Sequence, residues 1–175
     1  MAMALAIAFA VKLFLVALFF GVRAARRWRR QALSDPLTGL PNRRALDAAL
    51  ARAAPGLALL FIDVDRFKAV NDARGHAAGD ALLLALTATW PRGDFIARYG
   101  GDEFVALVPA ARAGALAQGL LVSARSAGAT LSIGRAEGDA ATLLLRADRA
   151  LALAKVRGGD RVVADSPAIG LLRVV

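Results

Sequence analysis

Apolar residues recur along the chain with two different periods, and the changes between them outline helices and strands. Short apolar or alternating runs predict strands over residues 57–65, 94–97, 104–108, 130–134 and 161–164. Longer runs predict helices over about 42–54, 79–90, 110–126 and 139–155, with turn residues between them. A tight turn joins the strands on either side of Gly100-Gly101, so the sheet must be mixed. This order predicts an α/β (α+β) fold, a palm-like or ferredoxin-like mixed sheet covered by helices.

The first 22 residues stand apart from this pattern because they are almost uniformly apolar. Residues 2–22 are long enough for a helix to cross a hydrocarbon layer of about 30 Å. Lys12 near the middle costs about 2.5–3.5 kcal/mol on insertion scales, and we expect the surrounding Leu, Ile, Val and Phe residues to offset most of this cost. A cleaved signal peptide fits less well, because the positive charge follows the apolar run. We therefore predict one transmembrane helix over residues 1–22, in contact with membrane lipid.

Residues 23–34 are strongly basic and are predicted to continue this helix as a juxtamembrane linker. The cluster consists of Arg23, Arg26, Arg27, Arg29 and Arg30. By the positive-inside rule it places the C-terminal side in the cytoplasm. The formal net charge of +9 would otherwise suggest nucleic-acid binding, but basic residues directly after an apolar run indicate membrane orientation and no nucleic-acid partner. The linker is either a dimer contact or a solvated segment, and the sequence leaves both readings open.

Turn residues over 35–44 mark the start of a separate domain over 35–164, which a tail over 165–175 follows. The buried strand of this domain ends in two acids, Asp63 and Asp65. A strand that delivers a carboxylate at its end is a rigid support for a metal site. We expect the two acids to face opposite ways, so that only one enters the site, and we favour Asp63. The absence of cysteine excludes disulfides and thiolate chemistry, and a single histidine excludes a His-rich metal site.

The next stretch carries varied polar groups in a compact, glycine-broken segment. Lys68, Asn71, His76 and Asp80 fall within it. A nucleotide would use all of them, since lysine neutralises phosphate and Asn or Asp binds the edge of a base. A structural hydrogen bond from His76 and ordinary turn or cap chemistry for Asn71 are the alternatives.

The predicted hairpin places two acids, Asp102 and Glu103, directly after Gly100-Gly101. Paired glycines allow a ligand to approach the backbone closely, and carboxylates at such a tip attract metal ions or protons. Taken alone, the stretch is more typical of a solvated turn. Its interpretation depends on whether Asp63 and the polar segment after it lie beside it.

Together, these stretches resemble one family, the GGDEF domains or diguanylate cyclases. Gly100-Gly101-Asp102-Glu103-Phe104 resembles the family signature. Further blocks follow the family's order: residues 35–43, residues 63–80, Ser132-Ile133-Gly134, and residues 147–155. The resemblance covers about residues 35–164.

The resemblance implies a signalling enzyme that condenses two GTP into cyclic di-GMP and releases two pyrophosphates. It implies two Mg²⁺ ions per active site, with Mn²⁺ as an alternative, held by the Asp63 carboxylate, the Val64 backbone carbonyl and Asp102. Asp102 would also accept the proton of the 3′-hydroxyl group, and Lys68 would stabilise the phosphoryl transition state. The product has two-fold symmetry, so each subunit of a homodimer would present one GTP.

The resemblance also implies the substrate-binding residues, which are Asn71 and Asp80 for the guanine, His76 near the sugar or base, Lys155 for the distal phosphates, and Gly100 and Gly101 beside the α-phosphate. With residues 1–34, it predicts a single-pass protein of the bacterial inner (cytoplasmic) membrane whose catalytic domain lies in the cytoplasm.

The chain departs from the family pattern at several positions. Gly159 stands where the family usually has a phosphate-binding arginine, and Ala152 stands where it often has tyrosine. The family's product-inhibition motif is Arg-x-x-Asp; Asp94 matches its aspartate, but Pro91 stands at the arginine position. We therefore expect no ordinary product inhibition. The alternative function is a degenerate GTP-binding or interaction module without cyclase activity.

Overall fold

The computed structural model describes residues 2–165 and divides the chain into two compact units, residues 1–34 and 35–175. The first unit is one uninterrupted helix, α1 (Ala2–Leu33). Within the part of the chain that the structure describes, no helix combines the length and apolar character needed to cross a membrane. The transmembrane helix predicted over residues 1–22 is therefore not confirmed. Of the predicted tail over 165–175, residues 166–175 lie outside the described range.

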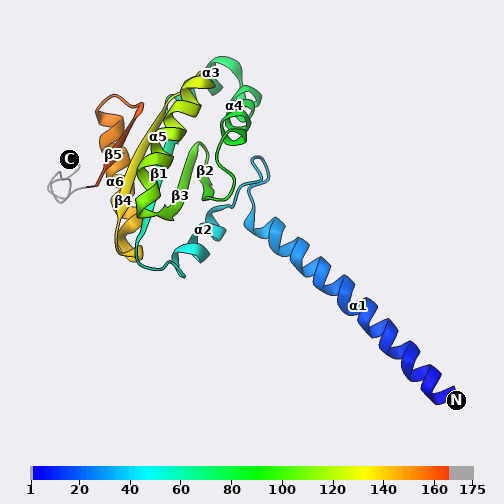
Figure 1. Ribbon diagram of the computed structural model, residues 1–175. Coiled ribbons are helices and arrows are strands. Elements are labelled where there is room, and N and C mark those ends of the chain that lie inside the picture. The colour runs from blue at the N-terminus through cyan, green and yellow to red at the C-terminus, as the bar shows by residue number, and fades with distance from the viewer. Residues whose placement is uncertain (1, 166–175) are drawn as a thin grey trace. The chain divides into compact units, whose positions relative to one another are not determined.

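The second unit is built on one five-stranded mixed sheet with strand order β2-β3-β1-β4-β5. The strands are β1 (Leu57–Val64), β2 (Phe95–Gly100), β3 (Glu103–Pro109), β4 (Leu131–Glu137) and β5 (Arg161–Ala164). The central strand β1 pairs antiparallel with β3 and β4, and β5 runs parallel to β4 (Figure 1). The predicted mixed sheet is confirmed, including the β2–β3 hairpin.

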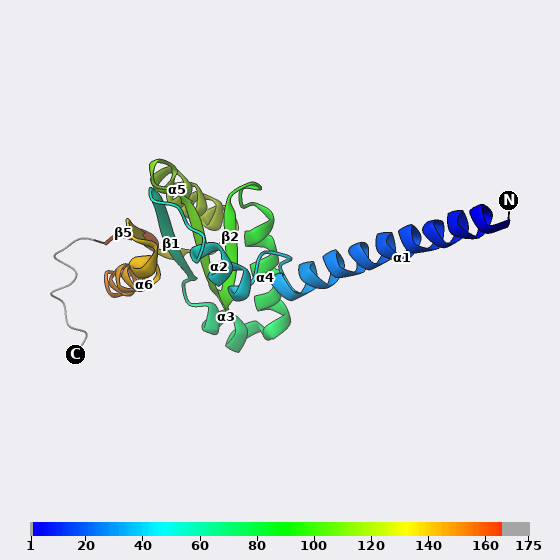
Figure 2. The same ribbon diagram turned by 90° about the horizontal axis from the view of Figure 1, so that it is seen from below.

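Helices cover both faces of the sheet, and the alternation of β1 divides the core between them. Ala58, Leu60 and Ile62 pack in one cluster with residues of α4 (His76–Ala88) and α5 (Ala110–Ser126). Leu59 and Phe61 pack in the other cluster, with residues of α2 (Arg43–Leu50) and α6 (Ala140–Val156). Figure 2 shows the layers. Because successive side chains alternate in a strand, Asp63 continues the row of Leu59 and Phe61 toward α6.

The helix bounds follow local capping signals. The Asn42 side chain accepts a hydrogen bond from the Ala45 N–H at 3.1 Å and starts α2, which ends at Leu50 rather than at about residue 54. Asp139 caps α6 through the Ala141 N–H. The helix predicted over 110–126 agrees with α5.

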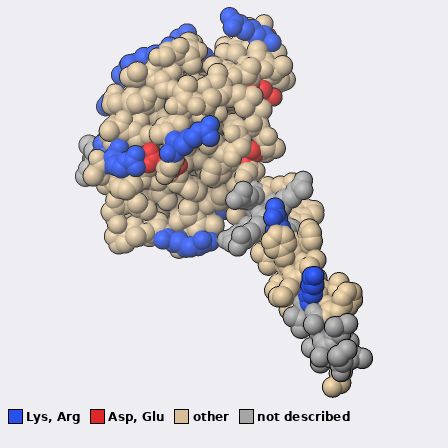
Figure 3. Space-filling model, turned by 45° about the vertical axis from the view of Figure 1, so that its right-hand side comes forward, with Lys and Arg blue, Asp and Glu red and all other residues tan. Residues whose placement is uncertain are grey.

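The polar stretch after β1 is more helical than its glycines suggest. It forms α3 (Phe67–Arg74), then Gly75 at a φ of 80°, then α4, which begins at His76 rather than at about residue 79. A single glycine with positive φ ends one helix and starts the next, so the predicted polar segment becomes a two-helix corner. On the face that Figure 3 shows, Lys and Arg side chains form separate groups with few acids between them.

Candidate active site

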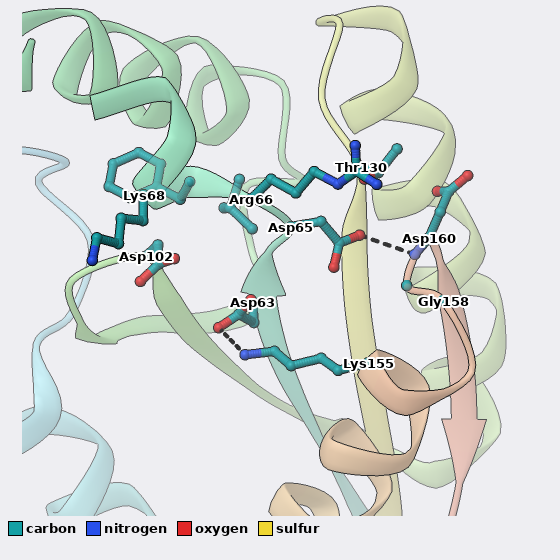
Figure 4. A pocket seen from close by; sticks show the side chains of 12 residues that line it. Asp63, Asp65, Arg66, Lys68, Asp102, Thr130, Lys155, Gly158 and Asp160 are labelled. Atoms are coloured by element: carbon teal, nitrogen blue, oxygen red, sulfur yellow. Dashed lines mark hydrogen bonds and ion pairs between the residues drawn. The ribbon is translucent and has the colours of Figure 1, made fainter. Parts of the chain in front are cut away.

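A cavity of about 730 Å³ lies where β1 ends, next to the β2–β3 hairpin and the C-terminal end of α6. Figure 4 shows it from close by. Four segments supply its walls: the end of β1 with the start of α3, the hairpin tip at Asp102, Thr130 directly before β4, and the end of α6 with the loop before β5. Of the predicted site residues, the structure brings together Asp63, Val64, Lys68, Asp102 and Lys155.

Asp63 is the most buried acid of this cavity, with a side chain that is 9% exposed. Burial raises the pKa of its carboxyl group, the Lys155 ammonium group opposes that shift, and the nearby Asp102 and Asp65 carboxylates add to it. The Lys155 Nζ atom lies 2.6 Å from Asp63 Oδ2. Lys155 stands on the last turn of α6, where a cation is favoured by the helix dipole.

Asp102 is placed by a hairpin whose backbone is tied to the rest of the domain. The Val64 N–H donates to the Asp102 carbonyl at 3.3 Å. The Arg98 guanidinium donates to the Gly101 carbonyl at 2.9 and 2.7 Å and to Asp35 Oδ1 at 3.0 Å. The hairpin tip is thus fixed to the end of β1 and to the first residue of the domain.

Arg98 and Asp35 support the hairpin tip from outside the cavity, and their contact was not predicted from the sequence. Although burial opposes it, hydrogen bonds from the Thr38 N–H and hydroxyl and from Arg98 hold the pKa of Asp35 below its ordinary value. The Asp35 carboxylate is therefore a fixed anchor for the Arg98 side chain. The turn-rich stretch at 35–44 was the available signal, but nothing in it indicated a partner 63 residues away.

Glu103 stands opposite Asp63 in the β1–β3 register. Burial, followed by the charge of Asp63, raises the pKa of its carboxyl group. Its side chain borders a second, smaller hollow together with Phe61, Tyr99 and Asp148, and it does not line the main cavity. Asp102 and Glu103 therefore differ in position although they are adjacent in sequence.

The expectation that Asp63 and Asp65 face opposite ways was wrong. Residues two apart along a strand share a face, and both acids line the cavity. Asp65 nevertheless differs from Asp63 in its partners, because it accepts hydrogen bonds from the Ser132 hydroxyl at 2.6 Å and from the Asp160 N–H at 2.9 Å.

The other predicted site residues do not line this cavity. His76 and Asp80 are exposed on α4, and Asn71 is half-buried on α3, with its Oδ1 atom buried and unpaired among the described residues. Gly100 and Gly101 are exposed in the hairpin. Since Lys68 of the same helix does line the cavity, α3 leads from the cavity to the α3–α4 corner, residues 67–80.

The donor set of the cavity suits a hard divalent cation. Asp63 and Asp102 offer carboxylate oxygens, the ligands such ions prefer, and the charge of Asp102 contributes to the raised pKa of Asp63. Among residues 2–165, no group of three or more His, Cys, Asp or Glu side chains is arranged to hold a metal. A bound cation would therefore need further oxygen ligands, from the backbone, from water or from a phosphate.

Comparison with known proteins agrees with this site. The family described as "Diguanylate cyclase, GGDEF domain" matches residues 32–161, and the chain belongs to it. The diguanylate cyclase DgcP of Pseudomonas aeruginosa is 40% identical over 164 residues, covering 77% of this chain and 24% of that protein. The diguanylate cyclase TpbB of the same species is 37% identical over 163 residues, covering 75% and 38%. The chain thus spans well under half the length of these relatives.

Solved structures show the same fold. The coiled coil and GGDEF domain of DgcB from Caulobacter crescentus, in complex with c-di-GMP, has a TM-score of 0.73 and 30% identity, and covers 88% of this chain and 98% of that one. The GGDEF domain of TpbB from Pseudomonas aeruginosa has a TM-score of 0.70 and 34% identity, and covers 78% and 96%.

Proposed function

We propose that this chain is a diguanylate cyclase that condenses two GTP into cyclic di-GMP and two pyrophosphates. The observation that carries the proposal is the meeting of Asp63, Asp102, Lys68 and Lys155 in one cavity within a GGDEF domain. A metal–nucleotide complex carries both positive metal ions and negative phosphates. The two carboxylates suit the metal ions, and the two lysines suit the phosphates.

Two Mg²⁺ ions, or Mn²⁺ in their place, would be held by Asp63, Asp102 and the Val64 carbonyl. When bound, such ions neutralise charge on the phosphates and on the leaving pyrophosphate. Lys155 and Lys68 would contact phosphate oxygens from opposite walls. The α3–α4 corner would bind guanine through Asn71 and Asp80, with His76 near the sugar.

The reaction would run twice, once for each new bond. The 3′-hydroxyl oxygen of one GTP attacks the α-phosphorus of the other, the bond to the β-phosphate oxygen breaks, and pyrophosphate leaves. The hydroxyl proton passes to Asp102, directly or through water. Because each cavity would hold one GTP, two subunits must face each other, and a homodimer is the active form.

Asp102→Ala tests the assignment. The full-length chain is incubated with GTP and Mg²⁺, and the products are separated by chromatography. We expect cyclic di-GMP from the wild-type chain and none from Asp102→Ala. Product from Asp102→Ala would contradict the role of Asp102.

The alternative is a GTP-binding module without cyclase activity, which Gly159 favours because it removes a phosphate-binding side chain. The same assay separates the two functions. A wild-type chain that binds GTP but forms no cyclic di-GMP, at concentrations where it is dimeric, would support the module.

Attachment to the bacterial inner membrane, with the catalytic unit in the cytoplasm, is proposed on the sequence of residues 1–34. Its support is the apolar run over 2–22 and the arginines after it. The full-length chain should stay in the membrane pellet after an alkaline carbonate wash. Release into the supernatant would contradict the anchor.

A further inference from the structure

Asp65 joins three segments of the cavity wall through its carboxylate and its backbone. The Ser132 hydroxyl of β4 donates to Oδ1 at 2.6 Å, and the Asp160 N–H of the loop before β5 donates to Oδ2 at 2.9 Å. The Asp65 N–H donates to the Thr130 carbonyl at 3.0 Å. Both carboxylate oxygens therefore already have a donor, and the acid holds the α6–β5 loop, residues 157–160, against the end of β1 (Figure 4).

Gly159 fits against this carboxylate because it has no side chain. A Cβ atom there would lie 2.9 Å from Asp65 Oδ1, closer than real Cβ contacts come, and 3.0 Å from Oδ2, which is tighter than most of them. The φ of Gly159 is also +73°, where other residues are strained. The arginine that the family usually carries at this position does not fit this loop conformation. Gly159 is thus the partner of Asp65 in one tight contact.

Backbone strain gathers at the same contact. Among residues 2–165, the non-glycine residues with positive φ are Arg66, at 57°, and Asp160, at 50°. Arg66 directly follows Asp65, and the Asp160 N–H donates to the Asp65 carboxylate. The Arg125 guanidinium holds Asp160 from the other side, with Nε 3.0 Å from each carboxylate oxygen. Strained residues persist only where the surrounding structure holds them, which marks this contact as one that the fold maintains.

The loop in turn fixes the backbone of Lys155. The Gly158 N–H donates to the Lys155 carbonyl at 3.0 Å, and the Gly159 N–H donates to the Ala154 carbonyl at 3.0 Å. With the Asp160 N–H on Asp65, the N–H groups of residues 158–160 all have partners. The loop therefore offers no free N–H to a phosphate, and its contribution to binding is the place it gives to Lys155.

We propose that Asp65 is a positioning residue, which holds the α6–β5 loop against the end of β1 through its contacts with Gly159 and the Asp160 N–H and so sets Lys155 for the nucleotide phosphates. The clamp rests on the proposed function for its ligand, GTP. It explains how this wall can be ordered with glycine at position 159.

The test compares Asp65→Ala, Asp65→Asn and Gly159→Ala in the full-length chain, with GTP binding measured by calorimetry in the presence of Mg²⁺. We expect Asp65→Ala to weaken GTP binding by about tenfold, as loss of an outer-shell partner does elsewhere. Asp65→Asn keeps one acceptor oxygen and should weaken it by only about threefold. In the cyclase assay, KM for GTP should rise more than kcat falls, because the clamp acts on binding.

A double-variant cycle separates the clamp from direct contact with the ligand. Asp65→Ala and Gly159→Ala break the same contact from opposite sides, so the double variant should bind GTP within about twofold of the weaker single variant. Gly119→Ala on α5, where a Cβ has nothing within 4 Å, is the matched glycine control. Additive losses in the double variant, or normal GTP binding by Asp65→Ala and Asp65→Asn, would overturn the proposal.

Hydrogen exchange without nucleotide keeps the test independent of the cyclase function. The Gly158 and Gly159 amides keep their own acceptors in Asp65→Asn and Asp65→Ala, so faster exchange at these two amides reports release of the whole loop. Unchanged exchange would overturn the clamp. A released loop in a chain whose wild type does not bind GTP would instead refute the proposed function.

Discussion

The two sides of the site are built in different ways. On the side of the α6–β5 loop, Asp63 is paired with Lys155, and both oxygens of Asp65 have donors. At the α3–α4 corner, Asn71 Oδ1 is buried without a partner among the described residues, and Asp80 is exposed. An unpaired buried oxygen costs about 1–3 kcal/mol, so the corner gains a hydrogen bond only when a ligand or water arrives. In the proposed function, the side that would bind the phosphates is therefore ordered in advance, and the side that would bind the base is completed by its ligand.

The largest effect should come from the most buried charge of the ordered side. Asp63→Asn removes a carboxylate that the cations would need, so cyclic di-GMP formation should fall by at least about a hundredfold. The same change should raise the melting temperature at neutral pH, because it removes a buried charge whose pKa is raised by burial. A variant that is inactive because it unfolds would contradict this.

The stability of the chain should depend on pH through the Asp63 carboxyl group. Because its pKa is raised in the folded chain, the folded state binds more protons than the unfolded state from the ordinary aspartate value upward. The contribution of Asp63 to stability is therefore present at low pH and lost as the pH rises through its folded pKa. Thermal unfolding across this window should show a smaller loss with rising pH for Asp63→Asn than for the wild-type chain.

Lys155→Met should have the next largest effect, on cation binding without nucleotide. Lys155 and a cation compete for Asp63, because the ammonium group lies 2.6 Å from the oxygen that a metal would use. A hydrogen bond between charged groups contributes about 1.5 kcal/mol or more, so Mn²⁺ should bind about tenfold more tightly to the variant. The affinity for GTP should fall at the same time.

Lys68→Met is the matched control for this measurement. Lys68 lines the same cavity, and it forms no ion pair with a carboxylate among the described residues. Removing its charge should change Mn²⁺ affinity by less than about threefold, since only through-solvent electrostatics is altered. Mn²⁺ titration followed by electron paramagnetic resonance measures both variants. Equal effects from the two lysines would argue against competition at Asp63.

Most residues of the ordered side could be predicted from the sequence, but the contacts that hold them in place could not. Asp63, Lys68 and Asp102 were predicted from the strand end, the polar segment after it and the hairpin tip, whereas Lys155 was predicted only through the resemblance to the GGDEF family. The ties of Arg98 to Asp35 and of Asp65 to Asp160 span 63 and 95 residues. Such contacts depend on the strand order of the sheet, which local periodicity does not contain. The α3–α4 corner was not predicted, because Gly75 was interpreted as part of an irregular segment and not as a single residue between two helices.

A smaller effect is expected at the corner. In Gly79→Ala, the new Cβ atom would lie 2.0 Å from Asn71 Oδ1 and 2.9 Å from Phe67 Cζ, so the Asn71 side chain must leave its position or α3 and α4 must separate. Overpacking of this kind costs about 1–3 kcal/mol, and GTP binding should weaken with the displaced Asn71. Thermal unfolding and GTP calorimetry measure the two effects. Unchanged GTP binding together with lower stability would show that Asn71 packs the corner without contacting the base.

The smallest effect is expected from added cyclic di-GMP, which should not change the rate of the reaction. Asp94, at the aspartate position of the family's product-inhibition motif, is paired within the chain: its Oδ1 lies 2.8 Å from Nη1 of Arg112, and its side chain is 4% exposed. The arginine position of the motif is Pro91. Cyclic di-GMP at concentrations well above those formed in the assay should therefore leave the initial rate unchanged.

Arg112→Ala distinguishes the two reasons for this insensitivity. If the Arg112–Asp94 pair alone blocks the site, the variant should become sensitive to added cyclic di-GMP, because Asp94 is released. If the insensitivity comes from the missing arginine at position 91, where Pro91 stands, the variant should stay insensitive. We expect this result, because a lone carboxylate repels the phosphates of the product. Inhibition of the wild-type chain by cyclic di-GMP would show that another surface of the domain binds the product.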